Sequence, residues 1–313
     1  MKSFQLDISR PLLAIAAAFL PIPMAVLAIA GESAEAQAQA SQIEQLPHIS
    51  VERSGTGSPV ILIPGLSMSR ESWRDTAQML AADHEVHLVQ INGFGGTPAG
   101  LNAGAGLLAG VAQDLASYLR QHQLEKVPLV GHSLGGALGL VVSRDAPELV
   151  GRLLIVDALP WLGLAMVPPE MVPAQIEPQA AALRDALMSR HGQPFDPARH
   201  AAETAGFASR AQDQELVGQW SAEADPRVTA WAFYEDMMLD LRPDMAAINA
   251  PVTVIYPLAG TPEERARSSA LYRSAFSEVR NSVMVPIEDS RHFVMLDQPM
   301  AFAVALKEFL QVW

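Results

Sequence analysis

The fold is decided by the stretch VPLVGHSLGG, residues 127–136. Its apolar first half predicts a buried strand, and the sequence after it predicts a helix. Between the two, Gly131, Ser133 and Gly135 form a G-x-S-x-G motif. Glycines suit such a sharp strand-to-helix turn because side chains would collide there, and the turn leaves the serine hydroxyl exposed. Ser133 is therefore the candidate nucleophile, and the backbone N–H of Leu134 is a candidate donor to charge that develops beside it.

Strand and helix signals alternate on both sides of this motif. Strands are predicted over 50–54, 59–63, 86–91 and 153–156, and helices over 70–82, 109–121 and 135–144. This alternation indicates consecutive right-handed β-α-β units on one parallel sheet. Strand signals return at 252–256 and 282–285 with a helix between them, and a last helix is predicted over 299–310.

Residues 161–241 interrupt the alternation. They contain no convincing strand, but amphipathic helical segments lie at 179–188 and 231–239, with prolines between them. We interpret this region as a helical cap. The cap is inserted into an α/β core that comprises residues 41–160 and 242–313.

The sequence resembles the α/β-hydrolase superfamily, in particular its serine esterase and lipase branch with a helical cap. GHSLGG at 131–136 is similar to the elbow of that superfamily, and the similarity runs from about residue 58 to the C-terminus. The resemblance implies an eight-stranded, mostly parallel sheet flanked by helices, with the cap over the carboxyl ends of the strands. It also implies a histidine base after the last strand. His292 lies in such a loop, between the strand at 282–285 and the last helix, and is the candidate base.

A second donor to the oxyanion is expected from the loop after the strand at 59–63. Many members of the superfamily have His-Gly there, whereas this chain has Pro64-Gly65-Leu66. The required donor is a backbone N–H, so the loss of the histidine side chain need not matter. Leu66 and Leu134 are therefore the two candidate oxyanion-hole residues.

The acid that orients the base is not at its usual position. Most members of the superfamily carry it after the penultimate strand, where this chain has Gly260. We favour Asp157, because some subfamilies, including haloalkane dehalogenases, carry their acid after the corresponding strand. Asp240 is a second candidate, although it resembles a residue that many members use in a structural ion pair. Glu263 would need a longer loop to fold back, and the fourth alternative is that no acid is present.

Composition excludes several classes of function. Half of the residues are hydrophobic and 18% are charged, which fits one large core with an insertion. A formal charge of -13 without any basic run argues against nucleic acid and anionic membranes as partners. The absence of cysteine excludes disulfides, thiol catalysis and lipid attachment through cysteine. No spacing of histidines and carboxylates suggests a metal site, and the glycine turn at 92–96 lacks the ending of a phosphate loop, so no cofactor is expected.

The N-terminal segment has the pattern of an export signal. Lys2 and Arg10 flank the start of an apolar run over 11–30, and small residues follow it. We expect residues 1–40 to be a signal peptide and leader tail, and the protein to be periplasmic or secreted. The alternative is an uncleaved membrane anchor, although prolines in the run weigh against a continuous helix. No other membrane contact is expected, and the sequence does not predict an oligomeric state.

Acyl transfer from Ser133 to water accounts for all the candidate site residues. The expected substrate is therefore a small molecule, a carboxylic ester or a lactone. The same side-chain geometry serves amide and carbon–carbon bond cleavage, and Ser133 excludes reactions that need an aspartate nucleophile. A catalytically silent protein that binds a small molecule under the cap is the alternative from another class.

Overall fold

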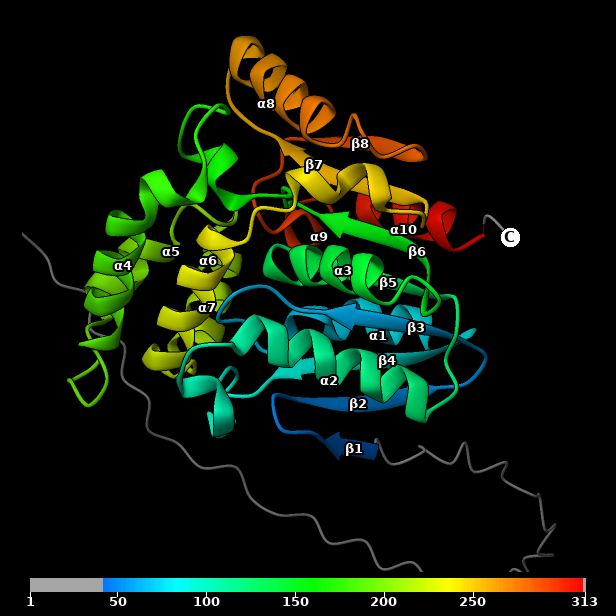
Figure 1. Cartoon of the computed structure of the whole chain (residues 1–313), viewed down its shortest axis with the longest axis horizontal. Coiled ribbons are helices and arrows are strands. Elements are labelled where there is room, and N and C mark those ends of the chain that lie inside the picture. Colours follow the sequence, from blue (N-terminus) through cyan, green and yellow to red (C-terminus); the bar gives the residue numbers. More distant parts are fainter. Residues whose placement is uncertain (1–41, 312–313) are drawn as a thin grey trace, which may run out of the picture. The chain divides into compact units, whose positions relative to one another are not determined.

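A single eight-stranded sheet forms the centre of the described chain (Figure 1). The computed structural model describes residues 42–311, and the predicted leader lies outside them. The strand order is β1-β2-β4-β3-β5-β6-β7-β8; β2 pairs antiparallel with both β1 and β4, and all other pairs are parallel. The mostly parallel sheet is therefore confirmed. The strands are β1 Gln42–Gln45, β2 Ile49–Gly55, β3 Ser58–Ile63, β4 His84–Ile91, β5 Val127–His132, β6 Val150–Val156, β7 Val252–Leu258 and β8 Ser282–Glu288.

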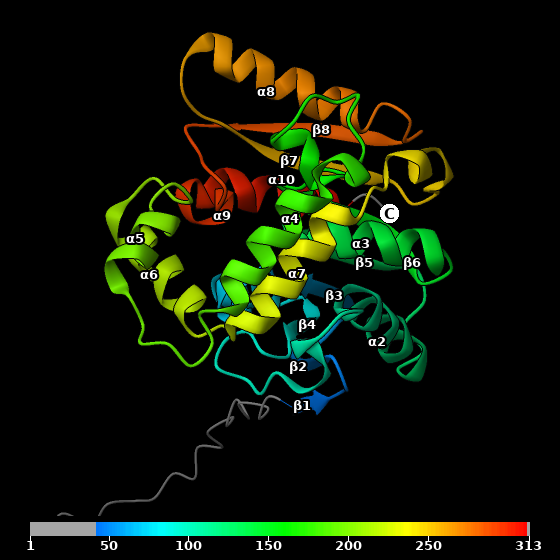
Figure 2. The same ribbon diagram turned by 60° about the vertical axis from the view of Figure 1, so that its left-hand side comes forward.

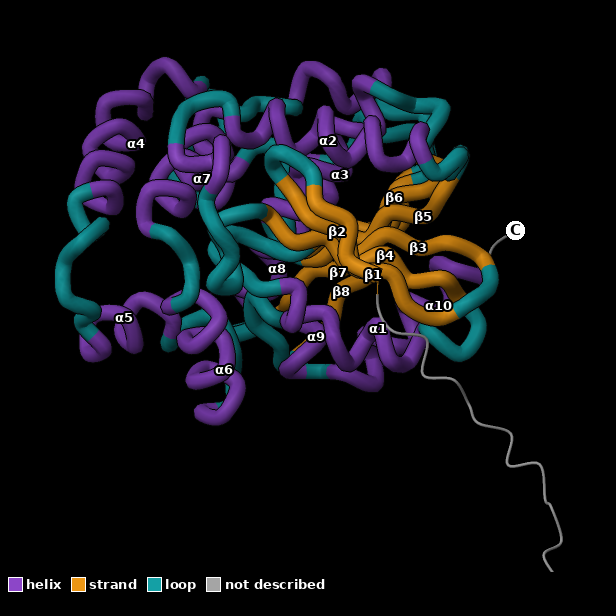
Figure 3. Tube along the Cα trace, turned by 90° about the horizontal axis from the view of Figure 1, so that it is seen from below, coloured by secondary structure: helices purple, strands orange, loops and turns teal. Residues whose placement is uncertain are grey.

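Helices cover both faces of the sheet (Figure 3). Residues of α2, α3 and α8 share one apolar cluster with the strands, and residues of α1, α9 and α10 share the other. Because both faces are covered, a central strand such as β5 is buried along its whole length and reads as a continuous apolar run. These helices are α1 Arg74–Leu80, α2 Leu107–Gln121, α3 Leu134–Asp145, α8 Pro262–Ala275, α9 Val294–Asp297 and α10 Pro299–Gln311.

Two elements differ from the predicted ones. Strand β1 was not predicted, because its sequence QIEQ is mostly exposed at the edge of the sheet and gives no clear apolar alternation. The helix predicted over 70–82 is a 3-10 turn, Arg70–Trp73, followed by the shorter α1. Trp73, the last residue of the 3-10 turn, has φ -106° and ψ 3° and lies outside the α-helical region.

The segment between β6 and β7 is helical. It contains α4 Pro173–Met188, α5 Pro197–Thr204, α6 Ala211–Ala222 and α7 Pro226–Met238. Helix α4 lies beside α7, and α5 lies beside α6 (Figure 2). The four helices lie over the carboxyl ends of the parallel strands (Figure 1). Between residues 42 and 311, no helix combines the length and the apolar character that a membrane span requires.

A carboxylate attaches the cap to the core. Glu235, on α7, accepts hydrogen bonds from the N–H groups of Gly106, Leu107 and Leu108 at 2.6, 3.2 and 2.8 Å. These N–H groups open α2 and have no acceptor within that helix, and the helix dipole also favours a negative charge there. The position of α7 over the sheet is thus fixed by a charge-assisted cap.

A buried histidine in the core should make stability depend on pH. His87 on β4 is 1% exposed, and burial lowers its pKa to about 4. The unfolded chain, with a histidine pKa of about 6.5, binds the proton first as the pH falls, so stability is lost from about pH 6.5 downward. Between pH 7 and pH 5 this histidine should account for about 2 kcal/mol of lost stability.

Urea unfolding of His87→Asn at pH 7 and pH 5 checks this. The variant should show a smaller pH dependence than the parent by that amount, whereas His191→Asn should match the parent, because the His191 side chain is 50% exposed. An unchanged pH dependence in His87→Asn would contradict the assignment.

Candidate active site

The candidate nucleophile lies on a strained turn between β5 and α3. Ser133 has φ 52° and ψ -122°, and its N–H donates to the carbonyl oxygen of Val156 at 2.9 Å. A Cβ on Gly131 would lie 2.2 Å from the carbonyl oxygen of Gly135, and one on Gly135 would lie 2.3 Å from that of Ile63. Both clashes involve backbone, which cannot move aside cheaply. Gly131 is therefore required by the packing within the turn, and Gly135 by the packing of the turn against β3.

The candidate base and the favoured acid lie together. His292 Nδ1 is 2.6 Å from Asp157 Oδ2, although the residues are 135 positions apart in the chain. Asp157 directly follows β6, has φ 49° and donates its N–H to the carbonyl oxygen of Ile255 at 2.8 Å. The two side chains are 28% and 13% exposed, respectively. A histidine that donates Nδ1–H to a carboxylate presents Nε2 as the free base.

Tyr272 on α8 holds the other oxygen of this carboxylate. Its hydroxyl donates a hydrogen bond to Asp157 Oδ1. Burial would raise the pKa of the Asp157 carboxyl, but the charge and hydrogen bond of His292, together with the Tyr272 bond, outweigh it and lower the pKa. Burial and the neighbouring carboxylate in turn raise the pKa of Tyr272 well above its usual value. Asp157 is therefore ionised and Tyr272 neutral at neutral pH.

The other two candidate acids do not contact His292. Asp240 pairs with Arg242 at 2.6 Å, and that guanidinium stacks over the ring of Trp161 at 4.2 Å. Asp240 thus makes a structural ion pair. Glu263 is exposed in the first turn of α8.

The histidine of the elbow supports the loop that carries the base. His132 Nε2 lies 3.0 Å from the carbonyl oxygen of His292, so this nitrogen carries the proton. Burial lowers the pKa of His132 to about 3, which keeps the ring neutral. The centroids of the two imidazole rings are 4.5 Å apart. A neutral His132 therefore fixes the loop of His292 without adding a competing positive charge.

The two candidate oxyanion donors are unpaired. Leu134 begins α3, and Leu66 lies in the loop after β3; neither N–H donates a hydrogen bond within residues 42–311. The loop packs against the elbow, since a Cβ on Gly65 would lie 3.2 Å from the Cβ of Ser133. Free backbone donors beside a nucleophile are what a developing oxyanion requires.

A small cavity joins these side chains. Its volume is about 170 Å³, and the Ser133 hydroxyl within it makes no hydrogen bond to His292 in the described part of the chain. Such bonds often form only when substrate is bound. The cavity is lined by Ser133, Ala137, Asp157, Ala158, Leu159, Leu162, Ala165, Asp236, Tyr272 and His292.

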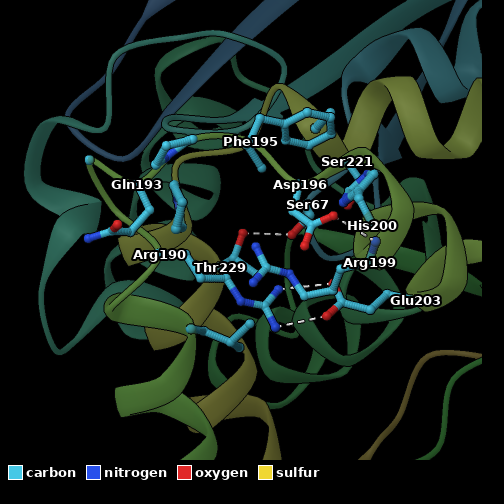
Figure 4. Close-up of a pocket in the computed structure, with 16 residues that line it drawn as sticks. Ser67, Arg190, Gln193, Phe195, Asp196, Arg199, His200, Glu203, Ser221 and Thr229 are labelled. Carbon is cyan, nitrogen blue, oxygen red and sulfur yellow. Dashed lines mark hydrogen bonds and ion pairs between the residues drawn. The ribbon is translucent and has the colours of Figure 1, made fainter.

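A larger cavity of about 320 Å³ lies between the cap helices and the loop after β3 (Figure 4). Its floor includes the hydroxyl pair of Ser67 and Thr229 at 2.7 Å, and Arg190 on its wall pairs with Glu203 at 2.8 Å. Despite its size, it contains none of the candidate nucleophile, base or acid residues. We therefore place the chemistry in the smaller cavity.

The described residues offer no place for a metal ion. Across positions 42–311, no cluster of three or more His, Cys, Asp or Glu side chains has the arrangement of a metal site.

Sequence reasoning missed Tyr272, Asp236 and Phe207. Tyr272 and Asp236 line the small cavity, and the ring of Phe207 lies 5.5 Å from that of His292. A tyrosine on a helix after the penultimate strand carries no motif. The sequence carries one weak indication of Asp236, which is an acidic residue among the Met and aromatic residues of the predicted cap helix at 231–239.

A sheet of this strand order, with an elbow at the end of β5, defines the nucleophile-elbow class of hydrolase folds. The chain belongs to the alpha/beta hydrolase family, whose model matches residues 60–306. This confirms the resemblance and the fold class drawn from the sequence.

Two curated relatives and one solved structure illustrate the likeness. A pimeloyl-[acyl-carrier protein] methyl ester esterase of Aeromonas salmonicida is 35% identical over 125 residues, 37% of this chain and 47% of that protein. A putative carbamate hydrolase of Variovorax paradoxus is 35% identical over 112 residues, 36% of this chain and 42% of that protein. The chain thus matches less than half the length of these relatives. A thermophilic esterase from Thermogutta terrifontis has a similar fold, with a TM-score of 0.69, 21% identity and coverage of 86% of this chain and 98% of that one.

Proposed function

We propose that this protein hydrolyses a small carboxylic ester or lactone through an acyl-enzyme on Ser133. The observation that carries the proposal is the 2.6 Å bond between His292 Nδ1 and Asp157 Oδ2, in the cavity that Ser133 also lines. The names of the related esterase and carbamate hydrolase, both of which cleave an acyl bond, support the same class of reaction.

The reaction follows from the roles of these groups. His292, oriented by Asp157, takes the proton from the Ser133 hydroxyl as Oγ attacks the carbonyl carbon of the substrate. The N–H groups of Leu66 and Leu134 stabilise the oxyanion, and the dipole of α3 adds to that effect. His292 then gives the proton to the leaving alcohol. Water, activated by the same histidine, releases the acid from Ser133.

The size of the cavity favours a short substrate. Ligand sites commonly measure about 300 to 1,000 Å³, whereas this cavity measures about 170 Å³. We expect turnover of p-nitrophenyl acetate and butyrate to exceed that of the octanoate. A burst of p-nitrophenol equal to the enzyme concentration would support the acyl-enzyme. Hydrolysis of amides but not esters, or no hydrolysis by folded protein, would favour amide cleavage or a silent binding protein instead.

Tyr272 should position the acid through its hydrogen bond. Tyr272→Phe removes the donor from Asp157, so we expect kcat to fall by about tenfold. The acid limb of the pH profile should also move to higher pH, because Asp157 loses one of the hydrogen bonds that lower its pKa.

Steady-state assays across pH check this, with Tyr256→Phe as the matched control. Tyr256 stacks on Tyr272 with ring centroids 4.5 Å apart, but its hydroxyl has no hydrogen-bond partner in the described chain. Equal profiles for the two variants would refute a positioning role.

Export is part of the proposal. The apolar run and its flanks in residues 1–40 support a cleaved leader and a periplasmic or secreted protein. Fractionation of cells that express the full chain, with N-terminal sequencing of the product, would test it. Full-length protein in the membrane fraction would favour the anchor.

A further inference from the structure

The small cavity contains a carboxylate that the proposed reaction does not use. Asp236, on the cap helix α7, lines the cavity with Ser133 and His292 and is half-buried. Its carboxylate makes no hydrogen bond or ion pair with any residue in the described part of the chain. Burial raises the pKa of this carboxyl to about 7. A carboxyl held without a partner in such a place is costly unless something else satisfies it.

The neighbouring charged groups are already paired. Glu235, beside it on α7, caps α2, and Arg242 beyond the helix is paired with Asp240. On α4, which packs against α7, Arg184 stacks on Trp231 and pairs with Asp185. Within residues 42–311, no lysine or arginine therefore pairs with Asp236.

The lining of the cavity carries acidic side chains and no permanently basic ones. It contains two carboxylates, Asp157 and Asp236, and neither lysine nor arginine among its described residues. Asp157 is occupied by His292 and Tyr272, so of the two carboxylates only Asp236 is left without a protein partner. Apart from Tyr272, whose hydroxyl is bonded to Asp157, the rest of the lining away from the triad is alanine and leucine, which offer no polar side chain.

We propose that Asp236 determines substrate specificity by accepting a hydrogen bond from a hydroxyl or ammonium group on the substrate. The proposal rests on the proposed ester hydrolysis and adds the class of substrate, an ester that carries such a donor near the scissile bond. Where Asp236 is ionised, a substrate with a second carboxylate is disfavoured, because it would face two carboxylates and neither lysine nor arginine.

Two series of esters, compared at about pH 8 where Asp236 is mostly ionised, test this. In the acyl series, phenyl butyrate is compared with phenyl 3-hydroxybutyrate, phenyl 3-aminobutyrate and monophenyl succinate. In the alcohol series, butyrate esters of propanol, ethylene glycol and ethanolamine are compared. In one of the two series, kcat/KM should be at least about tenfold higher for the esters that carry a donor than for the plain ester. The series that shows this preference tells whether the donor lies on the acyl or on the alcohol side of the ester. Monophenyl succinate should be the poorest acyl substrate.

Two variants separate the hydroxyl from the ammonium. Asp236→Asn keeps an acceptor oxygen but loses the charge, so the preference for hydroxyl should stay within about threefold and that for ammonium should fall by about tenfold or more. Asp236→Leu should abolish both preferences. Both variants should melt at a higher temperature than the parent, because each removes an unpaired carboxyl. Asp185→Asn is the control, since its 65% exposed side chain lies outside the cavity.

The outcomes are distinct. Ser133-dependent hydrolysis with equal rates on plain and donor-bearing esters, or a preference for monophenyl succinate, would overturn the role of Asp236 and leave the hydrolase function standing. Preferences that persist in Asp236→Leu would do the same. Failure of the parent to cleave any ester in either series would overturn both proposals.

Discussion

Ser133→Ala should lower kcat on p-nitrophenyl butyrate by about 10⁶-fold, down to the residual catalysis that oxyanion donors and substrate binding provide. The hydroxyl is the atom that forms and breaks the acyl bond, and no neighbouring side chain can replace it at the elbow. The variant should still fold, because the turn is stabilised by backbone contacts, among them the bond from the N–H of residue 133 to Val156.

Steady-state kinetics with a matched serine variant measure this effect. Ser143→Ala removes a hydroxyl from the same helix, α3, where it donates to the carbonyl oxygen of Gly139 at 2.7 Å. Its kcat should stay within about twofold of the parent, since such a helix-internal bond has only a small effect on structure. Turnover by Ser133→Ala above about 1% of the parent rate would mean that another group performs the chemistry.

Asp157→Asn should have the next largest effect, a loss of about 10⁴-fold in kcat. The amide keeps the shape of the side chain, but it no longer accepts the Nδ1–H of His292 with a full negative charge. His292 then loses both its fixed tautomer and the charge that stabilises its protonated form. The Tyr272 hydroxyl would also face a neutral group, so part of the effect arises from two weakened bonds at once.

Asp240→Asn is the control for this prediction. Asp240 contacts Arg242 rather than His292, so its replacement should leave kcat within a few-fold and reduce stability only slightly. The reverse pattern, with Asp240→Asn inactive and Asp157→Asn close to the parent, would show that Asp240 and not Asp157 orients His292.

Much of the fold could be predicted because it is encoded locally. Gly131 is required by a backbone clash within a turn of five residues, so the motif predicts the turn directly. The buried strands appear as apolar runs, since helices cover both of their faces. Strand β1 escaped prediction for the opposite reason: at the exposed edge of the sheet, nothing forces its residues into a pattern.

The site was only partly predictable. Asp157 could be proposed because the end of β6 lies at the same sheet edge as the elbow, and parallel strands bring their carboxyl ends together. Tyr272 could not, because its role depends on the direction of one side chain from a helix 115 residues further along the chain. The placement of Asp236 in the cavity lining depends on how the cap helix α7 is rotated about its axis, which no local pattern in the sequence specifies.

The most direct test of the central claim, that Ser133 is the nucleophile of a hydrolase, is labelling with a fluorophosphonate followed by mass spectrometry of the digested protein. One adduct per chain should appear on the peptide that contains Ser133. It should be absent in Ser133→Ala and form far more slowly in Asp157→Asn. Folded protein that takes up no label, or that carries it on another residue, would contradict the account.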